Sequence, residues 1–99
     1  MKKDTYSFIA LFSYGEDGIS ISFPDLPGCC PCADRDDTEM AMRNAKEALG
    51  LHIWGMEQDG EEIPVPSKIT DLQIEPGQTP VLVEVFLPPV RERMKARLM

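Results

Sequence analysis

Alternating apolar and polar positions predict two neighbouring strands near the start of the chain. Residues 6–14 are rich in aromatic and β-branched side chains and carry apolar residues on both faces, which is typical of a central strand. After a tight turn at residues 15–18, Ile19, Ile21 and Phe23 alternate with serines, which predicts a second strand with one solvated face. We expect these two strands to form a hairpin.

The segment after the hairpin predicts a short strand at a sheet edge. Residues 24–28 contain two prolines and a glycine, and they end the second strand because proline lacks the N–H donor that a ladder needs. Cys29 to Asp34 predict the third strand. Pro31 lies in its middle, and proline is confined to edge strands within a sheet.

After the third strand, apolar residues recur with the period of a helix instead of alternating. Asp36 or Asp37 can cap the helix, with Glu39 three residues after Asp36 as a capping box, and Asp59-Gly60 predicts its end. One apolar stripe follows helical spacing and should pack on the sheet: Ala41, Ala45, Ala48, Leu49, His52, Ile53 and Met56.

The last third of the chain predicts an irregular connection and one more strand. Residues 61–76 contain three prolines and lack the periodicity of a helix, whereas Val81, Val83 and Val85 alternate as a fourth strand that stops at Pro88-Pro89. The order β-β-β-α-β indicates an α+β domain. We expect a small mixed sheet, with a right-handed crossover and one main helix packed on one face.

Length and charge limit the possible functions. A chain of 99 residues can build one core only, and a formal net charge of −7 argues against nucleic acid as the main partner of the body. Four of the ten Lys and Arg residues lie in the last nine positions. We therefore expect one domain over residues 1–87, a basic linker or tail over residues 88–99, and a basic partner.

Two further features favour a cytoplasmic protein. The apolar runs are all shorter than a membrane span, and the stretch after Lys2 and Lys3 is too short and too rich in hydroxyls for a secretory signal. The three cysteines are bunched within four positions, and an odd number cannot form a disulfide framework.

The cysteine cluster nevertheless resembles two chemical motifs. Cys29, Pro31 and Cys32 spell the C-x-P-C pattern of disulfide oxidoreductases, but acidic neighbours at 34, 36 and 37 should raise the thiol pKa and suppress reactivity. The same spacing is half of a zinc knuckle, yet a second pair is missing and His52 is the one histidine. We expect no metal and no cofactor, with the cysteines acting as small apolar strand residues.

The carboxylates predict binding rather than catalysis. A two-metal nuclease needs acidic side chains that converge from several elements, whereas Glu47 and Glu84 are isolated. Because no nucleophile, base and orienting group occur together, we expect a non-enzymatic binding module. Trp54 is the candidate interface anchor, and the candidate acidic contacts to a partner are Asp25, Glu57 and Asp59.

Three stretches together resemble the HicB antitoxin family. Their sequences, with the residues they occupy, are FPDLPGC at 23–29, NAKEALGLH at 44–52 and GMEQDGEEIPVPS at 55–67. With VLVEV at 81–85, the resemblance runs in consistent order from about residue 6 to residue 85. Cys29 fits the family's Pro-Gly-Cys pattern, whereas Cys30 and Cys32 depart from it, so the strand register there is open.

The resemblance implies a fold and a function. The fold would be a partial RNase H-like domain, and the function would be to neutralise a HicA-like toxin, a small basic ribonuclease, by occluding its active site. Family members also carry a C-terminal DNA-binding segment. This segment is missing after residues 88–97, so we do not expect the chain to bind DNA alone.

Two other interpretations stay open. The chain could be a stand-alone β-rich interaction or ligand-binding module without a toxin partner, or an enzyme of the nuclease or thiol-oxidoreductase class. Exposed strand edges also favour a homodimer or a higher homo-oligomer, as family members form.

Overall fold

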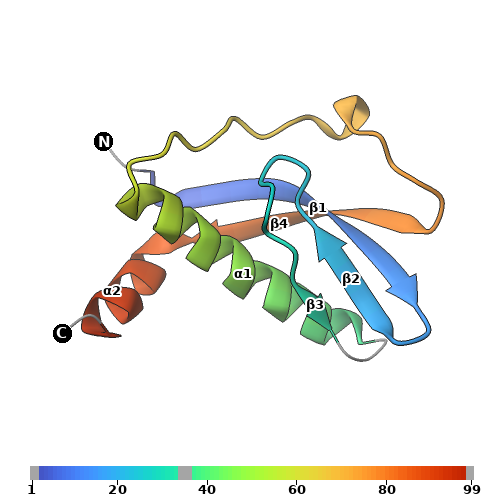
Figure 1. Cartoon of the computed structure of the whole chain (residues 1–99), viewed down its shortest axis with the longest axis horizontal. Coiled ribbons are helices and arrows are strands. Elements are labelled where there is room, and N and C mark those ends of the chain that lie inside the picture. Colours follow the sequence, from blue (N-terminus) through green and yellow to red (C-terminus); the bar gives the residue numbers. More distant parts are fainter. Residues whose placement is uncertain (1–2, 34–36, 98–99) are drawn as a thin grey trace.

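The computed structural model describes residues 3–33 and 37–97, and its elements follow the predicted order with one further helix at the end (Figure 1). The strands are β1 (Thr5–Gly15), β2 (Gly18–Ser22), β3 (Cys32–Ala33) and β4 (Gln78–Phe86). The helices are α1 (Thr38–Gln58) and α2 (Leu87–Arg97), and one 3-10 turn, η1 (Ile69–Asp71), lies between α1 and β4. The α+β class is therefore confirmed.

The four strands form one sheet in the order β3-β2-β1-β4, and all three pairings are antiparallel. The sheet is therefore antiparallel rather than mixed, and the expected crossover between parallel strands is absent among these four strands. Figure 1 shows the reason. The connection after α1 runs back along the length of the sheet, so β4 enters from the far end and runs against β1.

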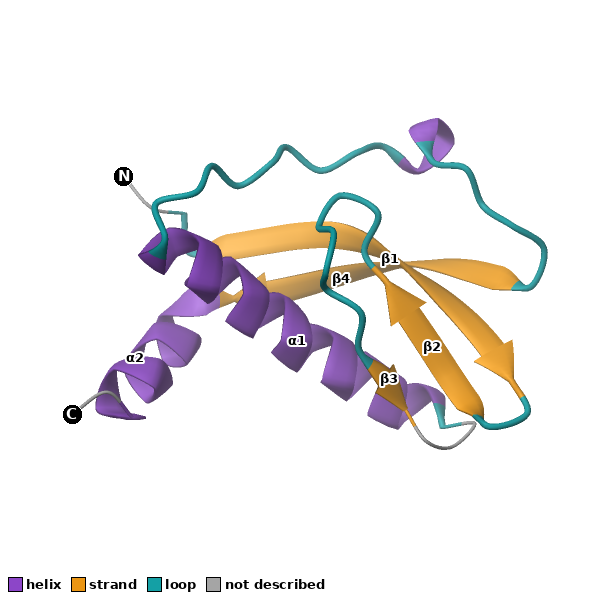
Figure 2. Ribbon diagram, in the orientation of Figure 1, coloured by secondary structure: helices purple, strands orange, loops and turns teal. Residues whose placement is uncertain are grey.

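The core lies between the sheet and α1 (Figure 2). Phe8 and Phe12 of β1 are fully buried together with Leu49 and Ile53 of α1, which confirms β1 as the central strand and the apolar stripe of α1 as the packed face. Three members of the predicted stripe, Ala48, His52 and Met56, are only partly buried.

The edge strand is shorter than predicted. The expected strand from Cys29 to Asp34 reduces to the two residues of β3, and Asp34 lies outside the described residues. Proline explains the shortening, since Pro31 can accept but not donate: its carbonyl accepts a hydrogen bond from the Ile21 N–H at 3.0 Å, just before the ladder begins. Asn44 of α1 then donates to the Cys32 carbonyl at 2.9 Å and holds β3 against the helix.

Local hydrogen bonds fix both ends of α1. The Asp37 carboxylate accepts from the Met40 N–H at 3.1 Å and is the N-cap, while the alternative cap, Asp36, lies outside the described residues. At the other end Gly60 has a φ of 71°, and the N–H groups of Gly60 and Glu61 donate to the carbonyls of Glu57 and Met56. This is a Schellman motif, so the helix ends where the Asp59-Gly60 pair predicts.

Residues that were expected to form a basic linker or tail form α2 instead. Pro88 and Pro89 end β4 as predicted, but they also fit the first turn of a helix, where backbone N–H groups have no intrahelical partner. Leu87 and Val90 are buried. The Val90 side chain packs so close to Gly50 of α1 that a Cβ at position 50 would lie 3.1 Å from it.

Candidate functional site

The three cysteines of the cluster lie in different environments. Cys29 is buried, whereas Cys30 and Cys32 are exposed, and all three thiols are free. Burial, followed by the nearby charge of Cys30, raises the pKa of the Cys29 thiol to about 11. The predicted direction is confirmed, but burial is the main cause, and the expected acidic neighbours Asp34 and Asp36 lie outside the described residues.

Other candidate chemistry is dispersed over the surface. Within residues 3–33 and 37–97, the His, Cys, Asp and Glu side chains form no group of three or more that could hold a metal ion. Glu47 lies exposed on α1, and Glu84 lies exposed on β4, where it accepts a long hydrogen bond of 3.4 Å from the Ser7 hydroxyl. The described helices also include none that is long and apolar enough to cross a membrane.

Asp25 has a structural partner. Its carboxylate accepts hydrogen bonds from the backbone N–H and the hydroxyl of Ser67, at 2.7 and 2.6 Å. These bonds fasten the irregular connection after α1 to the turn after β2. The Asp25 carboxylate is therefore already hydrogen-bonded within the molecule. The side chain also lines the cavity described below.

Glu57 has a structural partner as well. Its side chain is only 4% exposed, and its carboxylate accepts two hydrogen bonds from Arg91 of α2, the shorter at 2.7 Å. Arg91 also bonds the Asp4 carboxylate and the Lys3 carbonyl. The bonds to Glu57, followed by those to Asp4, raise the pKa of Arg91 above its ordinary value. No local sequence pattern predicts this ion pair, because its partners are 34 positions apart.

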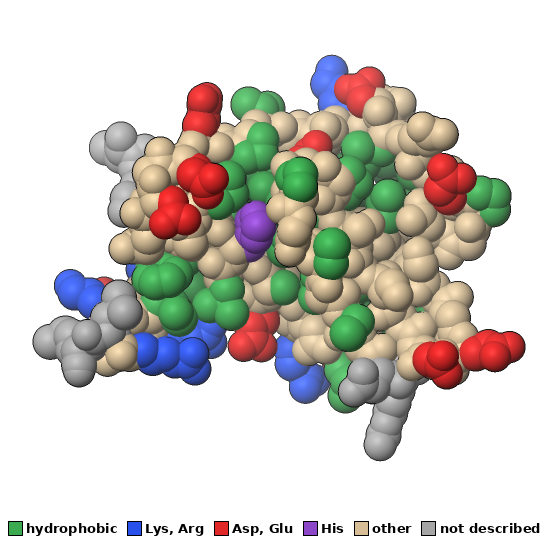
Figure 3. Space-filling model, in the orientation of Figure 1, with side chains coloured by type: hydrophobic (Ala, Val, Ile, Leu, Met, Phe, Trp, Pro, Cys, Tyr) green, Lys and Arg blue, Asp and Glu red, His purple; other side chains and the backbone are tan. Residues whose placement is uncertain are grey.

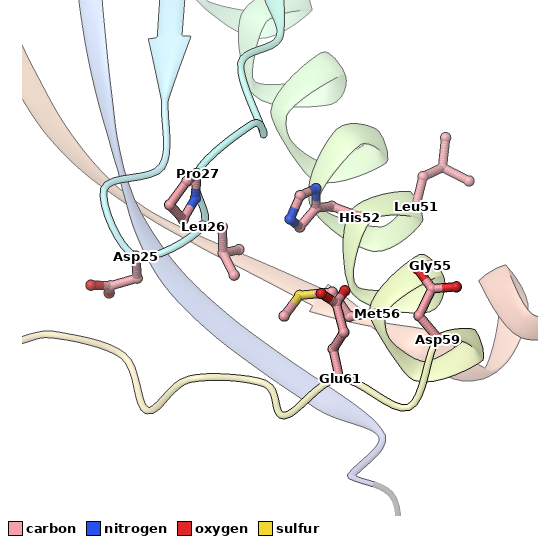
Figure 4. Close-up of a pocket in the computed structure, with 9 residues that line it drawn as sticks. All are labelled: Asp25, Leu26, Pro27, Leu51, His52, Gly55, Met56, Asp59 and Glu61. Atoms are coloured by element: carbon pink, nitrogen blue, oxygen red, sulfur yellow. The ribbon is translucent and has the colours of Figure 1, made fainter.

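The end of α1 presents acidic side chains beside a cavity. A cavity of about 470 Å³ lies between the last turns of α1 and the turn after β2. Its lining comprises three acidic side chains, the one histidine and apolar contacts: Asp25, Leu26, Pro27, Leu51, His52, Gly55, Met56, Asp59 and Glu61 (Figure 4). The His52 ring points toward the turn at Leu26 and Pro27. The Asp25 carboxylate points away from His52.

The structure brings two of the four predicted contact residues to this cavity. Asp25 and Asp59 line it, whereas Glu57 is held by Arg91 and Trp54 lies half-buried against the core. Glu61 and His52 were not among the predicted contacts. The Schellman motif could have revealed Glu61, since it folds the residue after Gly60 back over the helix end.

Charges of opposite sign are separated over this face of the molecule (Figure 3). Acidic side chains gather over the end of α1, and Lys and Arg side chains gather over α2. The histidine lies between them, among hydrophobic side chains. The carbonyl end of α1 adds to the negative field, because its last turn contains no basic residue.

Three comparisons with known structures agree on the fold. A HicA3 and HicB3 toxin-antitoxin complex contains a chain that is 22% identical, with a TM-score of 0.66, over 81% of this chain and 98% of that one. A toxin-antitoxin complex from Streptococcus pneumoniae matches at 18% identity and a TM-score of 0.77, over 87% and 72%. The N-terminal domain of Burkholderia pseudomallei antitoxin HicB matches at 22% identity and a TM-score of 0.66, over 79% and 95%.

Sequence comparisons also identify the family of this chain. An uncharacterised 14.9 kDa protein from the rep-hol intergenic region of Haemophilus phage HP1 is 41% identical over 69 residues, 70% of this chain. The chain spans about half the length of that relative, 50%. A model of the HicB_like antitoxins of bacterial toxin-antitoxin systems matches residues 8–96. The chain therefore belongs to the HicB_like antitoxin family.

Proposed function

We propose that this chain binds a small, basic, HicA-like mRNA-cleaving toxin and neutralises it by covering the toxin's active site, without catalysing a reaction itself. The family match over residues 8–96 carries this proposal. Two of the similar structures are toxin-antitoxin complexes, which supports a protein partner. A net charge of −7 suits a basic partner, and the β-β-β-α-β order supports the partial RNase H-like kinship.

The end of α1 is the contact surface that we propose for the toxin. A Lys or Arg side chain of the toxin could lay its aliphatic stem along Leu26, Pro27 and Met56 and place its charge between Asp59 and Glu61. The negative end of the α1 dipole favours a cation at the same place. Trp54, one turn before the helix end, would supply apolar contact area beside it.

Growth rescue tests the function. Cells that express a basic HicA-like toxin encoded beside this chain should stop growing, and co-expression of this chain should restore growth. The two proteins should also purify as one complex. Absence of both rescue and complex would contradict the proposal and favour a stand-alone binding module.

Charge reversal tests the contact surface. The double variant Asp59→Lys/Glu61→Lys should slow association with the toxin about tenfold or more, because it inverts the field at the cavity. Glu16→Lys/Asp17→Lys changes the net charge equally at the exposed β1–β2 turn and is the matched control. Equal slowing by both double variants would show that overall charge, not this cavity, guides the toxin.

A cytoplasmic location completes the proposal. Three free cysteines suit a reducing compartment. Fractionation of cells that produce the untagged protein should place it with cytoplasmic markers.

A further inference from the structure

Cys30 and Cys32 have no part in the proposed function, and they lie on one face of the chain. Side chains alternate here: Cys29 is buried, Pro31 is half-buried, and Cys30 and Cys32 are exposed. In an extended segment, residues two apart point to the same side. Both thiols therefore face solvent together, and the expected role of small apolar strand residue fits Cys29 alone.

The backbone that carries the two thiols is held extended. Cys32 pairs with Ser20 in the β2–β3 ladder. The Pro31 carbonyl continues the same register by accepting from the Ile21 N–H at 3.0 Å. Proline fixes its own φ and also restricts the residue before it to extended conformations. The spacing between Cys30 and Cys32 is therefore set by the fold.

This spacing is too wide for a disulfide and suits an ion between the two sulfur atoms. Same-face neighbours on a strand lie about 7 Å apart. A disulfide needs Cβ atoms about 4 Å apart, so closing one between Cys30 and Cys32 would distort the backbone around Pro31. A single metal ion adds one metal–sulfur bond on each side and spans the difference without moving the strand.

The surroundings of Cys32 favour a cation. Ser13 of β1, Ser20 of β2 and Cys32 of β3 lie abreast across the sheet. All three line a cavity of about 360 Å³, together with the exposed residues Glu16 and Asp17. These two carboxylates make the local field negative, which attracts a positive ion toward the thiols.

The number of ligands selects the class of ion. Zinc in a structural site takes four ligands, and in the described part of the chain no His, Cys, Asp and Glu side chains gather in a group of three that could hold a metal. Cys29 does not supply a third thiolate, because it is buried and its pKa is raised to about 11. Thiolates prefer soft ions, and Cu(I) is stable between two sulfur ligands in a linear arrangement.

We propose that Cys30 and Cys32 form a two-coordinate binding site for a soft monovalent cation, Cu(I). The ion displaces one proton from each thiol and forms two copper–sulfur bonds, which gives a singly negative complex and two free protons. The oxidation state of copper does not change. The site lies beside the first half of α1, where Asn44 bonds the Cys32 carbonyl, and away from the cavity at the end of α1 (Figure 1).

An anaerobic titration of the whole chain tests the site. Cu(I), supplied as its acetonitrile complex, should transfer from the chromophoric chelator bicinchoninate to the protein until one ion is bound per chain. Copper X-ray absorption of this complex should report two sulfur neighbours. Zn²⁺ should bind far more weakly, because two thiolates leave its tetrahedral shell half empty.

Three single substitutions form a matched set, since each leaves two thiols in the chain. Cys30→Ser and Cys32→Ser break the pair and should weaken Cu(I) binding about a hundredfold or more. Cys29→Ala keeps the pair and should leave the affinity unchanged. The sulfur count of the unsubstituted chain answers the same question where Cys29→Ala destabilises the core.

A proline substitution tests the preset spacing. Pro31→Gly keeps both thiols but frees the backbone between them, so it should weaken Cu(I) binding about tenfold. Circular dichroism should show that the copper-free variant keeps the fold. An unchanged affinity would contradict the preset geometry.

Several results would overturn the proposal. Cys30→Ser could bind Cu(I) as tightly as Cys29→Ala, or absorption could report three sulfur neighbours, which would bring Cys29 out of the core. A mixture of Cys30→Ser and Cys32→Ser chains could recover full affinity, which would place the ion between two chains. Rapid closure of a disulfide between Cys30 and Cys32 in oxidised glutathione, seen by intact mass, would contradict the extended spacing.

Discussion

At the residue scale, Cys29 shows how burial controls the chemistry of a thiol. It lies in the core beside the Pro-Gly turn, and the two exposed cysteines next to it share its motif but not its environment. Only the thiolate attacks a disulfide reagent, so a pKa of about 11 keeps almost all of Cys29 unreactive at neutral pH.

Thiol titration therefore has a predicted outcome. At pH 8 an aromatic disulfide reagent should modify Cys30 and Cys32 quickly and Cys29 roughly a hundredfold more slowly. The slow rate should rise about tenfold per pH unit up to pH 10, because the thiolate fraction rises tenfold per unit below the pKa. Cys29→Ala should remove the slow phase and leave the fast one. Three equally fast thiols would contradict the burial of Cys29.

The two carboxylates that contact Arg91 differ in burial, which predicts different energetic contributions. Glu57→Gln should destabilise the fold by about 1.5–3 kcal/mol, because a nearly buried charge-assisted pair is lost. Asp4→Asn should cost less than about 1 kcal/mol, since the Asp4 side chain is 61% exposed. Urea unfolding of both variants measures the difference. Equal losses would show that the burial of Glu57 adds nothing.

Several single residues could be assigned from sequence, and others could not. Asp37 as a cap, Gly60 at the helix end and the apolar stripe of α1 depend on neighbours within one or two turns, so a local pattern identifies them. The roles of Asp25 and Glu57 depend on Ser67 and Arg91, far along the chain. Their charge alone suggested partner contacts instead.

At the element scale, α2 is the largest difference from what the sequence predicts. Two consecutive prolines and a run of basic residues are typical of a linker. The apolar residues that dock the helix, Leu87, Val90 and Met94, have helical spacing but cover only two turns, which is too short a run to outweigh that pattern. Packing against α1 decides the outcome. Because Gly50 has no side chain, Val85 and Val90 can pack closely against α1 at this position.

A pair of glycine substitutions in α1 tests this packing. Both Gly50→Ala and Gly55→Ala gain up to about 1 kcal/mol of helix propensity. A Cβ at position 55 meets nothing within 4 Å, whereas a Cβ at position 50 would lie 3.1 Å and 3.2 Å from the methyl groups of Val90 and Val85. We therefore expect Gly55→Ala to raise the free energy of unfolding. The free energy of unfolding of Gly50→Ala should be lower than that of Gly55→Ala by about 1 kcal/mol or more.

Thermal and urea unfolding of the two variants measure this difference. Truncating the neighbour, in Gly50→Ala/Val90→Ala, should recover part of the difference. Equal stabilisation by both glycine substitutions would show that α2 does not press on α1.

At the scale of the whole molecule, the proposed partnership depends on how charge is distributed. Acidic groups gather over the end of α1 and basic groups gather over α2, so each of these regions has a strong local field. The net charge alone is moderate for 99 residues. The overall charge was readable from sequence. The cavity beneath the acidic groups was not, because two segments far apart in the sequence, residues 25–27 and 51–61, build it.

Salt should therefore act on the encounter with the toxin more than on the finished complex. Raising NaCl from about 0.05 M to about 0.5 M should slow association about tenfold or more, because the screening length falls several-fold. The dissociation rate should change much less, since buried apolar contacts control it. Surface plasmon resonance at both salt concentrations separates the two rates. A change confined to dissociation would contradict electrostatic guidance.

The pairing of β1 with β4 also determines when this fold can form during synthesis. β1 leaves the ribosome first, but the strand that completes its pairing spans residues 78–86, and Arg91 then bonds Lys3 and Asp4. Such long sequence separations give a high contact order and slow folding. The central strand must therefore wait beside its β2 neighbour, with one side open, until almost the whole chain has been translated.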